Sequence, residues 1–187
     1  MKGNNLKIKE KPIELPNEGI HNSTCLSLID LGTHFDEKLK QFLRQFLLTF
    51  ELEDRDSEGN RFLYAKIYTQ GTHKKSNLRK AIEVMKGKMS DKEGEGLELK
   101  SMLGEGAFLN IERDDKGNTK FASISPLPES MEKLQLEKEV LYFSIDDWPE
   151  NEGLFETLSP MLKKKIQHSK EWEEIKKESP EKAGVTS

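Results

Sequence analysis

The residues best suited to chemistry lie between Arg61 and Lys92, where basic side chains are interleaved with aromatic ones. This stretch carries nine Lys or Arg residues and two acids, a net charge of +7, in a chain whose overall charge is −4. The basic residues are interleaved with Tyr64, Tyr68 and His73. Cations interleaved with rings are typical of a surface that binds phosphates and stacks the bases of a single-stranded nucleic acid. The alternative for the charge run alone is a solvated helix face.

No catalytic, metal or cofactor site is indicated. The four histidines are widely spaced, and the chain lacks HExxH, CxxC, phosphate-loop and nucleophile-elbow patterns. Asp114 and Asp115 fit a hairpin turn, and the single cysteine, Cys25, fits a core position. We therefore expect a protein that is not an enzyme and uses no cofactor. A nuclease is the least favoured class, because no cluster of metal-binding carboxylates accompanies the basic stretch.

The composition fits one domain of ordinary size with an appendage. The chain has 187 residues, of which 34% are hydrophobic, enough for one core but thin for two. No run approaches the roughly 18 apolar residues of a membrane span, and the first residues lack the apolar core of a signal peptide. We expect a cytoplasmic protein without a membrane partner.

The hydrophobic pattern predicts a mainly β fold. Expected strands cover residues 24–31, 39–52, 61–69, 107–113 and 119–125, and a helix opens at the N-cap Ser76 and stops near Gly87. The run 39–52 also has helical spacing, but its alternation favours a strand. Three strands, a helix and two strands form the element order of a five-stranded OB-type barrel with its helix between strands 3 and 4. An open β-sandwich or an α+β sheet would give a similar order.

Strand alternation predicts which side chains face outward. In residues 61–69, the face with Leu63 and Ile67 is expected to line the barrel, and the face with Tyr64, Lys66 and Tyr68 is expected to face solvent. In the last hairpin, the expected core residues are Ala107, Leu109, Ile111, Ala122 and Ile124. Phe108 and Phe121 then lie on the other face, where they either stack bases or pack under the C-terminal residues.

Composition divides the chain into four parts. Residues 1–19 are expected to be a flexible N-terminal arm, 20–128 the OB-fold nucleic-acid-binding domain, 129–178 an acidic C-terminal arm with a short helix, and 179–187 a disordered tail. From Glu129 to Pro160 there are nine acids and two lysines, a net charge of −7, and Ser159-Pro160 opens the expected helix.

The chain also resembles a known family through a series of short motifs in order. They are Leu28-Ile29-Asp30-Leu31-Gly32-Thr33, Leu48-Thr49-Phe50-Glu51-Leu52, Tyr68-Thr69, Ser76-Asn77-Leu78-Arg79-Lys80, Lys86-Gly87-Lys88, Leu103-Gly104 and Ile124-Ser125-Pro126-Leu127-Pro128. Together they are similar to small phage-encoded OB-fold single-stranded-DNA-binding proteins, over about residues 20–128 and more weakly from Phe143 to Trp172. The family often has an aromatic residue before the basic Gly-Lys pair, where this chain has Met85. The resemblance implies a role in phage DNA replication or recombination, in the host cell cytoplasm.

These observations lead to the hypothesis of a sequence-tolerant protein that coats and protects single-stranded DNA. The expected phosphate contacts are Lys40, Arg44, Lys66, Lys74, Lys75, Arg79, Lys80, Lys86 and Lys88, and the expected stacking residues are Tyr64 and Tyr68. In the acidic arm, the expected partner-binding residues are Phe143, Asp146, Asp147 and Trp148. The arm either recruits phage or host replication and recombination proteins or folds over the basic groove in competition with DNA.

The main alternative is a protein-interaction module, such as a phage-encoded inhibitor or assembly factor, that uses the same barrel to bind a protein partner. A binder that prefers duplex DNA or RNA is a smaller alternative. Further copies of the chain, in a homo-oligomer, are also candidate partners, and the sequence does not specify the oligomeric state.

Overall fold

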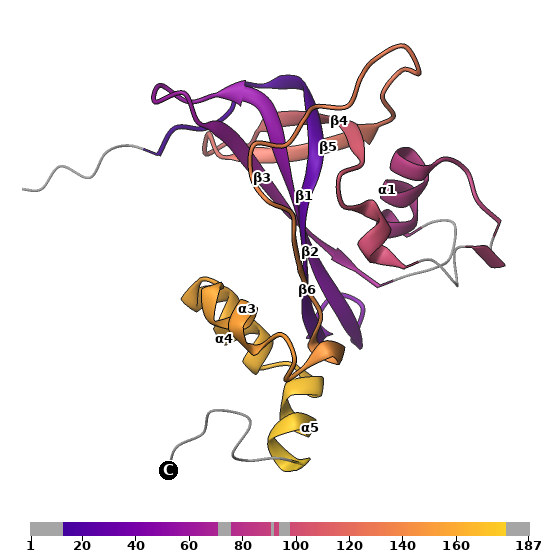
Figure 1. The fold of residues 1–187 in the computed structure, drawn as a ribbon, viewed down its shortest axis with the longest axis vertical. Coiled ribbons are helices and arrows are strands. Elements are labelled where there is room, and N and C mark those ends of the chain that lie inside the picture. Colours follow the sequence, from indigo (N-terminus) through magenta and orange to yellow (C-terminus); the bar gives the residue numbers. More distant parts are fainter. Residues whose placement is uncertain (1–12, 71–75, 91, 94–97, 179–187) are drawn as a thin grey trace, which may run out of the picture.

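The computed structural model describes residues 13–70, 76–90, 92–93 and 98–178, and a β sheet forms its centre (Figure 1). The strands are β1 (Gly19–Asp36), β2 (Gln41–Arg55), β3 (Arg61–Thr69), β4 (Gly106–Arg113), β5 (Thr119–Ser125) and β6 (Leu141–Phe143). The helices are α1 (Asn77–Lys86), α3 (Glu152–Thr157), α4 (Pro160–Gln167) and α5 (Lys170–Glu178), with the short 3-10 turns η1 (Leu99–Met102) and η2 (Ile145–Asp147).

Strand β1 is the central strand of the six-stranded sheet and pairs with three others. One of its edges pairs antiparallel with β2 from Ser23 to Asp36. Its other edge pairs antiparallel with β4 over residues 19–24 and parallel with β6 over residues 27–29. The resulting path is β3-β2-β1-β4-β5, with β6 beside β1. Register shifts at residues 25–27 and 30–32 mark two bulges, which let an 18-residue strand bend and serve both parts of the sheet.

The expected mainly β fold and its element order are confirmed. Strands β3 and β5 occupy the predicted residues, and the Ser76 hydroxyl accepts a hydrogen bond from the backbone N–H of Arg79, as an N-cap should. Two expectations about the sheet are wrong. Strand β1 does not end at Gly32 but continues through a bulge to Asp36, and a sixth strand, β6, joins the sheet.

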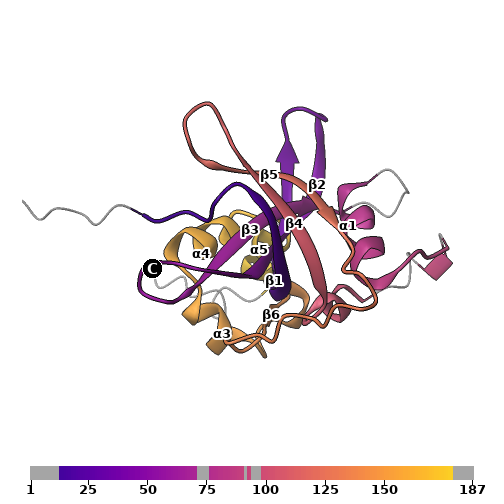
Figure 2. The same ribbon diagram turned by 90° about the horizontal axis from the view of Figure 1, so that it is seen from above.

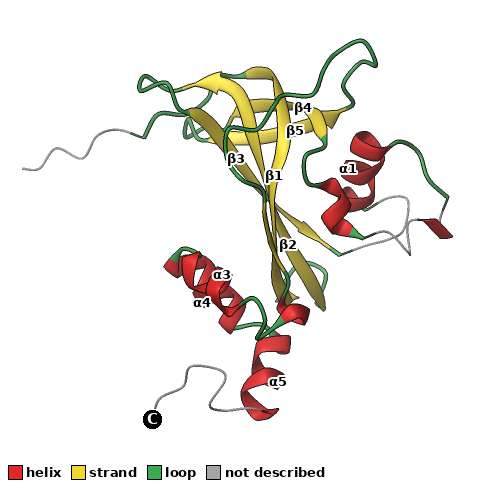
Figure 3. Ribbon diagram, viewed as in Figure 1, coloured by secondary structure: helices red, strands yellow, loops and turns green. Residues whose placement is uncertain are grey.

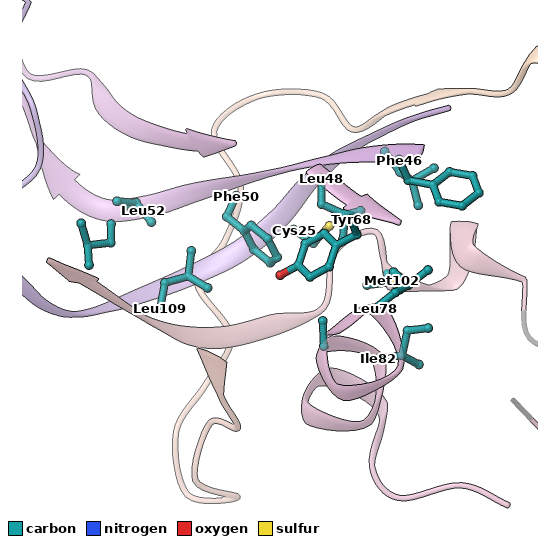
Figure 4. Packing of buried hydrophobic residues seen from close by; sticks show 13 residues of the cluster. Cys25, Phe46, Leu48, Phe50, Leu52, Tyr68, Leu78, Ile82, Met102 and Leu109 are labelled. Carbon is teal, nitrogen blue, oxygen red and sulfur yellow. The ribbon is translucent and has the colours of Figure 1, made fainter. Parts of the chain in front are cut away.

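The first core lies between the sheet and α1 (Figure 4). Alternate side chains of β2 supply Phe46, Leu48, Phe50 and Leu52, all under 9% exposed. The expected core positions Ala107, Leu109 and Ile111 of β4 are confirmed as fully buried. Helix α1 closes this core with the apolar stripe Leu78, Ala81 and Ile82, whose i, i+3, i+4 spacing places them on one helix face.

A second core joins the C-terminal residues to the far part of β1. Ile29 and Leu31 of β1 pack with Phe143 of β6 and with the buried helix residues Phe155, Leu158, Ile166 and Trp172. Figures 1 and 3 show α3, α4 and α5 around the lower end of the β1–β2 hairpin, and the view from above in Figure 2 shows them apart from α1. The acidic arm is therefore an integral part of the fold, with three helices and a strand rather than one short helix.

Gly32 allows the close approach of these helices to the sheet. Its φ is +76°, and a Cβ placed there would lie 2.3 Å from the Cβ of Ser169. The adjacent Thr33 N–H donates to the Glu171 carboxylate at 2.7 Å. The glycine bend that the sequence predicts thus serves as the docking point of α5.

Two ion pairs between strands of the sheet, each with a buried carboxylate, also bind residues of the arm. Arg44 of β2 donates to Asp30 of β1, with Nη2 2.5 Å from Oδ2, and its Nη2 also lies 2.8 Å from Asp146 Oδ1 of the arm. The hydrogen bonds that Arg44 donates to Asp30 and Asp146 raise the pKa of its guanidinium. In the second pair, the buried Glu51 accepts from Arg61 at 2.8 Å and from the Glu137 N–H at 2.9 Å.

The described part of the N-terminal segment is held against the sheet. Glu14 accepts from the backbone N–H of Ser57 at 2.8 Å, and Arg113 donates to the carbonyl of Pro16 at 2.5 Å. The remainder of the expected flexible arm, residues 1–12, and the expected tail, 179–187, lie outside the described residues.

Candidate nucleic-acid interface

The candidate site lies where the two ends of the strand path, β3 and β5, face each other beside α1. In the sheet, β3 and β5 are not paired by backbone hydrogen bonds, but their side chains meet across the space between them. The rings of Tyr64 on β3 and Phe121 on β5 have centroids 6.3 Å apart. We call this space between β3, β5 and α1 the seam.

The seam opens into a cavity of about 740 Å³. Strand β3 lines it with Lys66 and Tyr68, and β5 lines it with Phe121 to Ile124. Helix α1 and the residues after it contribute Asn77, Lys80, Glu83, Val84, Gly87 and Lys88. A volume of this size is typical of small-ligand sites, and the mixture of rings, methyl groups and lysines suits a ligand that is both anionic and flat.

Lys66 is the central cation of the seam. Its ammonium lies 3.2 Å from the centroid of the Phe121 ring and 5.1 Å from that of Tyr68. It has no carboxylate partner among the described residues, and burial lowers the pKa of Lys66 to about 8. A half-buried ammonium that only aromatic faces stabilise is a favourable position for an anionic ligand.

Two further lysines lie at the rim of the cavity, positioned by α1. Lys80 and Lys88 are exposed and, within the described chain, neither forms an ion pair. The one acid of the lining, Glu83, accepts a hydrogen bond from Arg79 Nε at 2.8 Å. Arg79 also donates to the carbonyls of Met89 and Ser90, which fixes the chain next to Lys88. The net electrostatic effect at the seam is therefore positive.

The predicted phosphate contacts separate into distinct groups. Lys66, Lys80 and Lys88 come together at the seam. Arg79 is 1% exposed and Arg44 is held by Asp30 and Asp146, so these two are structural in this fold, contrary to expectation. Lys86 pairs with Glu105 at 2.9 Å, and Lys40 pairs with Glu37 at the tip of the β1–β2 hairpin. Lys74 and Lys75 lie outside the described residues.

The predicted faces of β3 are the reverse of those observed. Register with β2 places Tyr64, Lys66 and Tyr68 opposite Phe50, Leu48 and Phe46, on the core side of the sheet. Leu63 and Ile67, expected to line the barrel, are each 47% exposed. Tyr68 is 2% exposed and lies beside Phe50 and Cys25 in Figure 4, so its ring offers no face for a base. Tyr64 is half-buried at the seam.

Phe121 is the site residue that sequence reasoning assigned to the wrong face. The register of β4 with β5 shifts between Asn110 and Ile111, so that Phe121 pairs with Ile111 and Ile124 with Leu109. Both side chains therefore face the first core, while Ala122 is exposed. A bulge breaks the period of two on which the prediction rested, and nothing in the local sequence marks it.

The four arm residues expected to bind partners do not form one surface. Phe143 is fully buried in the second core, and Trp148 packs against Trp172 with ring centroids 4.7 Å apart. Asp146 is exposed but pairs with Arg44, and Asp147 is exposed. None of the ion pairs found in the described chain joins the arm to Lys66, Lys80 or Lys88, and no residue of 129–178 lines the seam cavity.

A second group of exposed rings lies at the tip of the β1–β2 hairpin. Phe35 and Phe42 are 45% and 52% exposed, with centroids 5.2 Å apart. The Lys170 ammonium lies 3.3 Å from the Phe42 ring centroid. Leu39, at the turn, is also exposed. Three exposed apolar side chains are therefore gathered at this tip, which the sequence pattern did not predict.

Replacing Tyr68 with Phe tests its structural role. The Tyr68 hydroxyl is buried and finds no hydrogen-bond partner among the described residues, and burial raises the pKa of this group. We expect Tyr68→Phe to leave the free energy of unfolding unchanged or to raise it by up to about 1 kcal/mol. Urea unfolding measures this, and Tyr68→Ala, which removes the ring, should cost about 3–5 kcal/mol. A loss of stability in Tyr68→Phe comparable to that in Tyr68→Ala would contradict the assignment.

Comparison with known proteins gives no further constraint: a scan against protein-family models and a search of curated proteins find no match to the chain. Within the described ranges, no helix is long and apolar enough to cross a membrane. The same residues contain no group of three or more His, Cys, Asp or Glu side chains arranged to hold a metal ion.

Proposed function

We propose that this chain is a non-enzymatic, sequence-tolerant single-stranded-DNA-binding protein that coats and protects single strands. One observation carries the proposal: the seam cavity combines Lys66, Lys80 and Lys88, which lack carboxylate partners in the described part of the chain, with the half-buried ring of Phe121. Single strands expose both a phosphate backbone and base faces, and a surface with cations and rings uses both.

The proposal includes an OB-type barrel as the scaffold. Its support is the strand path β3-β2-β1-β4-β5 with α1 between β3 and β4 along the chain, together with the contact of Tyr64 and Phe121 between the path's two ends. An OB barrel is partly open by nature, so side-chain contact across the seam is compatible with it. The resemblance to phage-encoded single-strand binders supports a role in phage DNA replication or recombination.

Binding of a labelled single strand of about 30 nucleotides, in comparison with its duplex, tests the proposal. We expect the single strand to bind more tightly. Three phosphate contacts imply a fall of about 20-fold in affinity between about 50 and 200 mM monovalent salt, from a slope of about −0.7 per phosphate. Equal or tighter binding of the duplex, or no binding at low salt, would reject the proposal, and an RNA strand of the same sequence as competitor shows whether DNA is preferred.

The exposed apolar side chains favour a protein-interaction module as the second candidate. Leu63 and Ile67 project from the outer face of β3, and Phe35, Leu39 and Phe42 are exposed at the hairpin tip. Exposed apolar groups of this kind often mark protein contacts. If single-strand binding fails, substitutions at these positions are the ones that should abolish binding of a protein partner.

A further inference from the structure

The face of the Phe121 ring is covered by the protein's own lysine. Lys66 Nζ lies 3.2 Å from the ring centroid, closer than any other cation–ring contact in the described residues. A base cannot stack on that face while the ammonium occupies it. The Lys66 ammonium must therefore leave the face of Phe121 before a base can stack on this ring.

A phosphate is suited to cause this exchange. Lys66 has a flexible side chain and no carboxylate partner among the described residues, so its ammonium is held by ring faces alone. A cation–ring contact is worth less than a charge-assisted hydrogen bond to a phosphate oxygen. The rim lysines Lys80 and Lys88 add positive potential at the same opening. An entering phosphate can therefore draw Lys66 outward.

We infer that the seam cavity holds one unpaired nucleotide of the bound strand, whose phosphate takes the Lys66 ammonium and whose base takes the vacated face of Phe121. This inference rests on the proposed single-strand binding and names where one base inserts. The cavity of about 740 Å³ has room for a nucleotide, and the ring of Tyr68 and the side chain of Ile124 form its apolar wall. A base in a duplex enters less readily, because it must first leave its pair and its stack, which costs free energy that an unpaired base does not require.

Substitutions of Phe121 and Lys66 distinguish the contribution of the base to binding from that of the phosphate. Phe121→Leu should lower affinity for an oligodeoxyadenylate about tenfold, as expected for one lost stacking contact, and leave affinity for an abasic strand of equal length unchanged. Lys66→Met should weaken binding of both strands. Phe108→Leu is the matched control, because Phe108 is a half-buried phenylalanine of the neighbouring strand β4 that does not line the cavity.

The pH profile gives an independent readout of Lys66. Its pKa in the free protein is about 8, and a bound phosphate raises the pKa by stabilising the charged form. Binding therefore takes up a proton above pH 8, so affinity is full near pH 7 and falls about tenfold towards pH 9.5 as the free Lys66 becomes neutral. The other titratable groups described at the seam are Tyr68, Lys80, Glu83 and Lys88, which line the cavity with Lys66, and Tyr64, which contacts Phe121. Because adenine does not titrate in this range, Lys66→Met should remove most of the decline.

The outcomes distinguish this inference from the proposed function. Three results would overturn the inserted nucleotide and leave single-strand binding intact. The first is that Phe121→Leu does not change the affinity for single strands, and the second is that it changes the affinity for adenylate and abasic strands equally. The third is that the decline of affinity with pH persists in Lys66→Met. Absence of single-strand binding by the full chain would overturn both.

Discussion

Replacing Lys66, Lys80 and Lys88 together with Gln is expected to weaken binding of single-stranded DNA about 500-fold at about 50 mM monovalent salt. The physical reason is the loss of counterion release from three phosphate contacts, for which log affinity falls with a slope of about −2 against log salt. The contribution of the three contacts to affinity vanishes at about 1 M salt. At about 200 mM salt, the triple variant should therefore bind about 30-fold more weakly than the wild type. Fluorescence anisotropy at several salt concentrations measures both the loss and the flatter slope of the variant.

A matched variant controls for net charge. Lys116, Lys120 and Lys164 are exposed lysines that do not line the seam cavity, and replacing all three with Gln removes the same charge. This variant should bind almost as the wild type does. If both triple variants lose affinity equally, long-range charge and not the seam accounts for binding. Unchanged urea unfolding of the seam variant would show that its fold is intact.

Arg44→Met is expected to lower the free energy of unfolding by about 3–5 kcal/mol. Arg44 is the partner of Asp30, whose side chain is 2% exposed, and its removal leaves a buried carboxylate without its counterion. The same guanidinium also binds Asp146, so the substitution loosens the connection between the sheet and the arm. Urea or thermal unfolding measures the loss, and a second substitution, Asp30→Asn, should restore part of it by removing the uncompensated charge.

Lys40→Met provides the comparison for this prediction. Lys40 and Glu37 form an ion pair in the same hairpin, but their side chains are 72% and 78% exposed. An exposed pair of this kind contributes about 0–1 kcal/mol, because water and salt screen it. A similar loss in Arg44→Met and Lys40→Met would contradict a structural role for the buried pair.

The arrangement of the arm changes how competition with DNA can be tested. Residues 129–178 supply one side of the second core, so their deletion would expose Ile29 and Leu31 and damage the sheet. The arm's carboxylates Asp146 and Glu137 bind arginines of β2 and β3 and not the lysines of the seam. Single substitutions on the exposed surface of the arm, such as Asp147→Asn, therefore test competition more cleanly than truncation.

Local patterns in the sequence determined the element types and most of their bounds. Strand β3 and strand β5 match the prediction because turn residues delimit both, and α1 begins after Ser76 because a serine side chain satisfies a backbone N–H that the helix leaves free. The basic character of residues 61–92 and the absence of catalytic motifs are equally properties of the sequence.

Only the tertiary structure decided which of these side chains form a site. The register of β3 with β2 turned Tyr68 inward and Leu63 outward, and a bulge opposite β4 brought Phe121 to Lys66. Burial of Arg79, and the pairing of Arg44 with Asp30 and Asp146, removed two arginines from the expected binding surface. Each of these results depends on contacts between residues far apart in the chain. The alternation of side chains along a strand is the same whichever face is buried, so only strand register and burial decide which face points to the core.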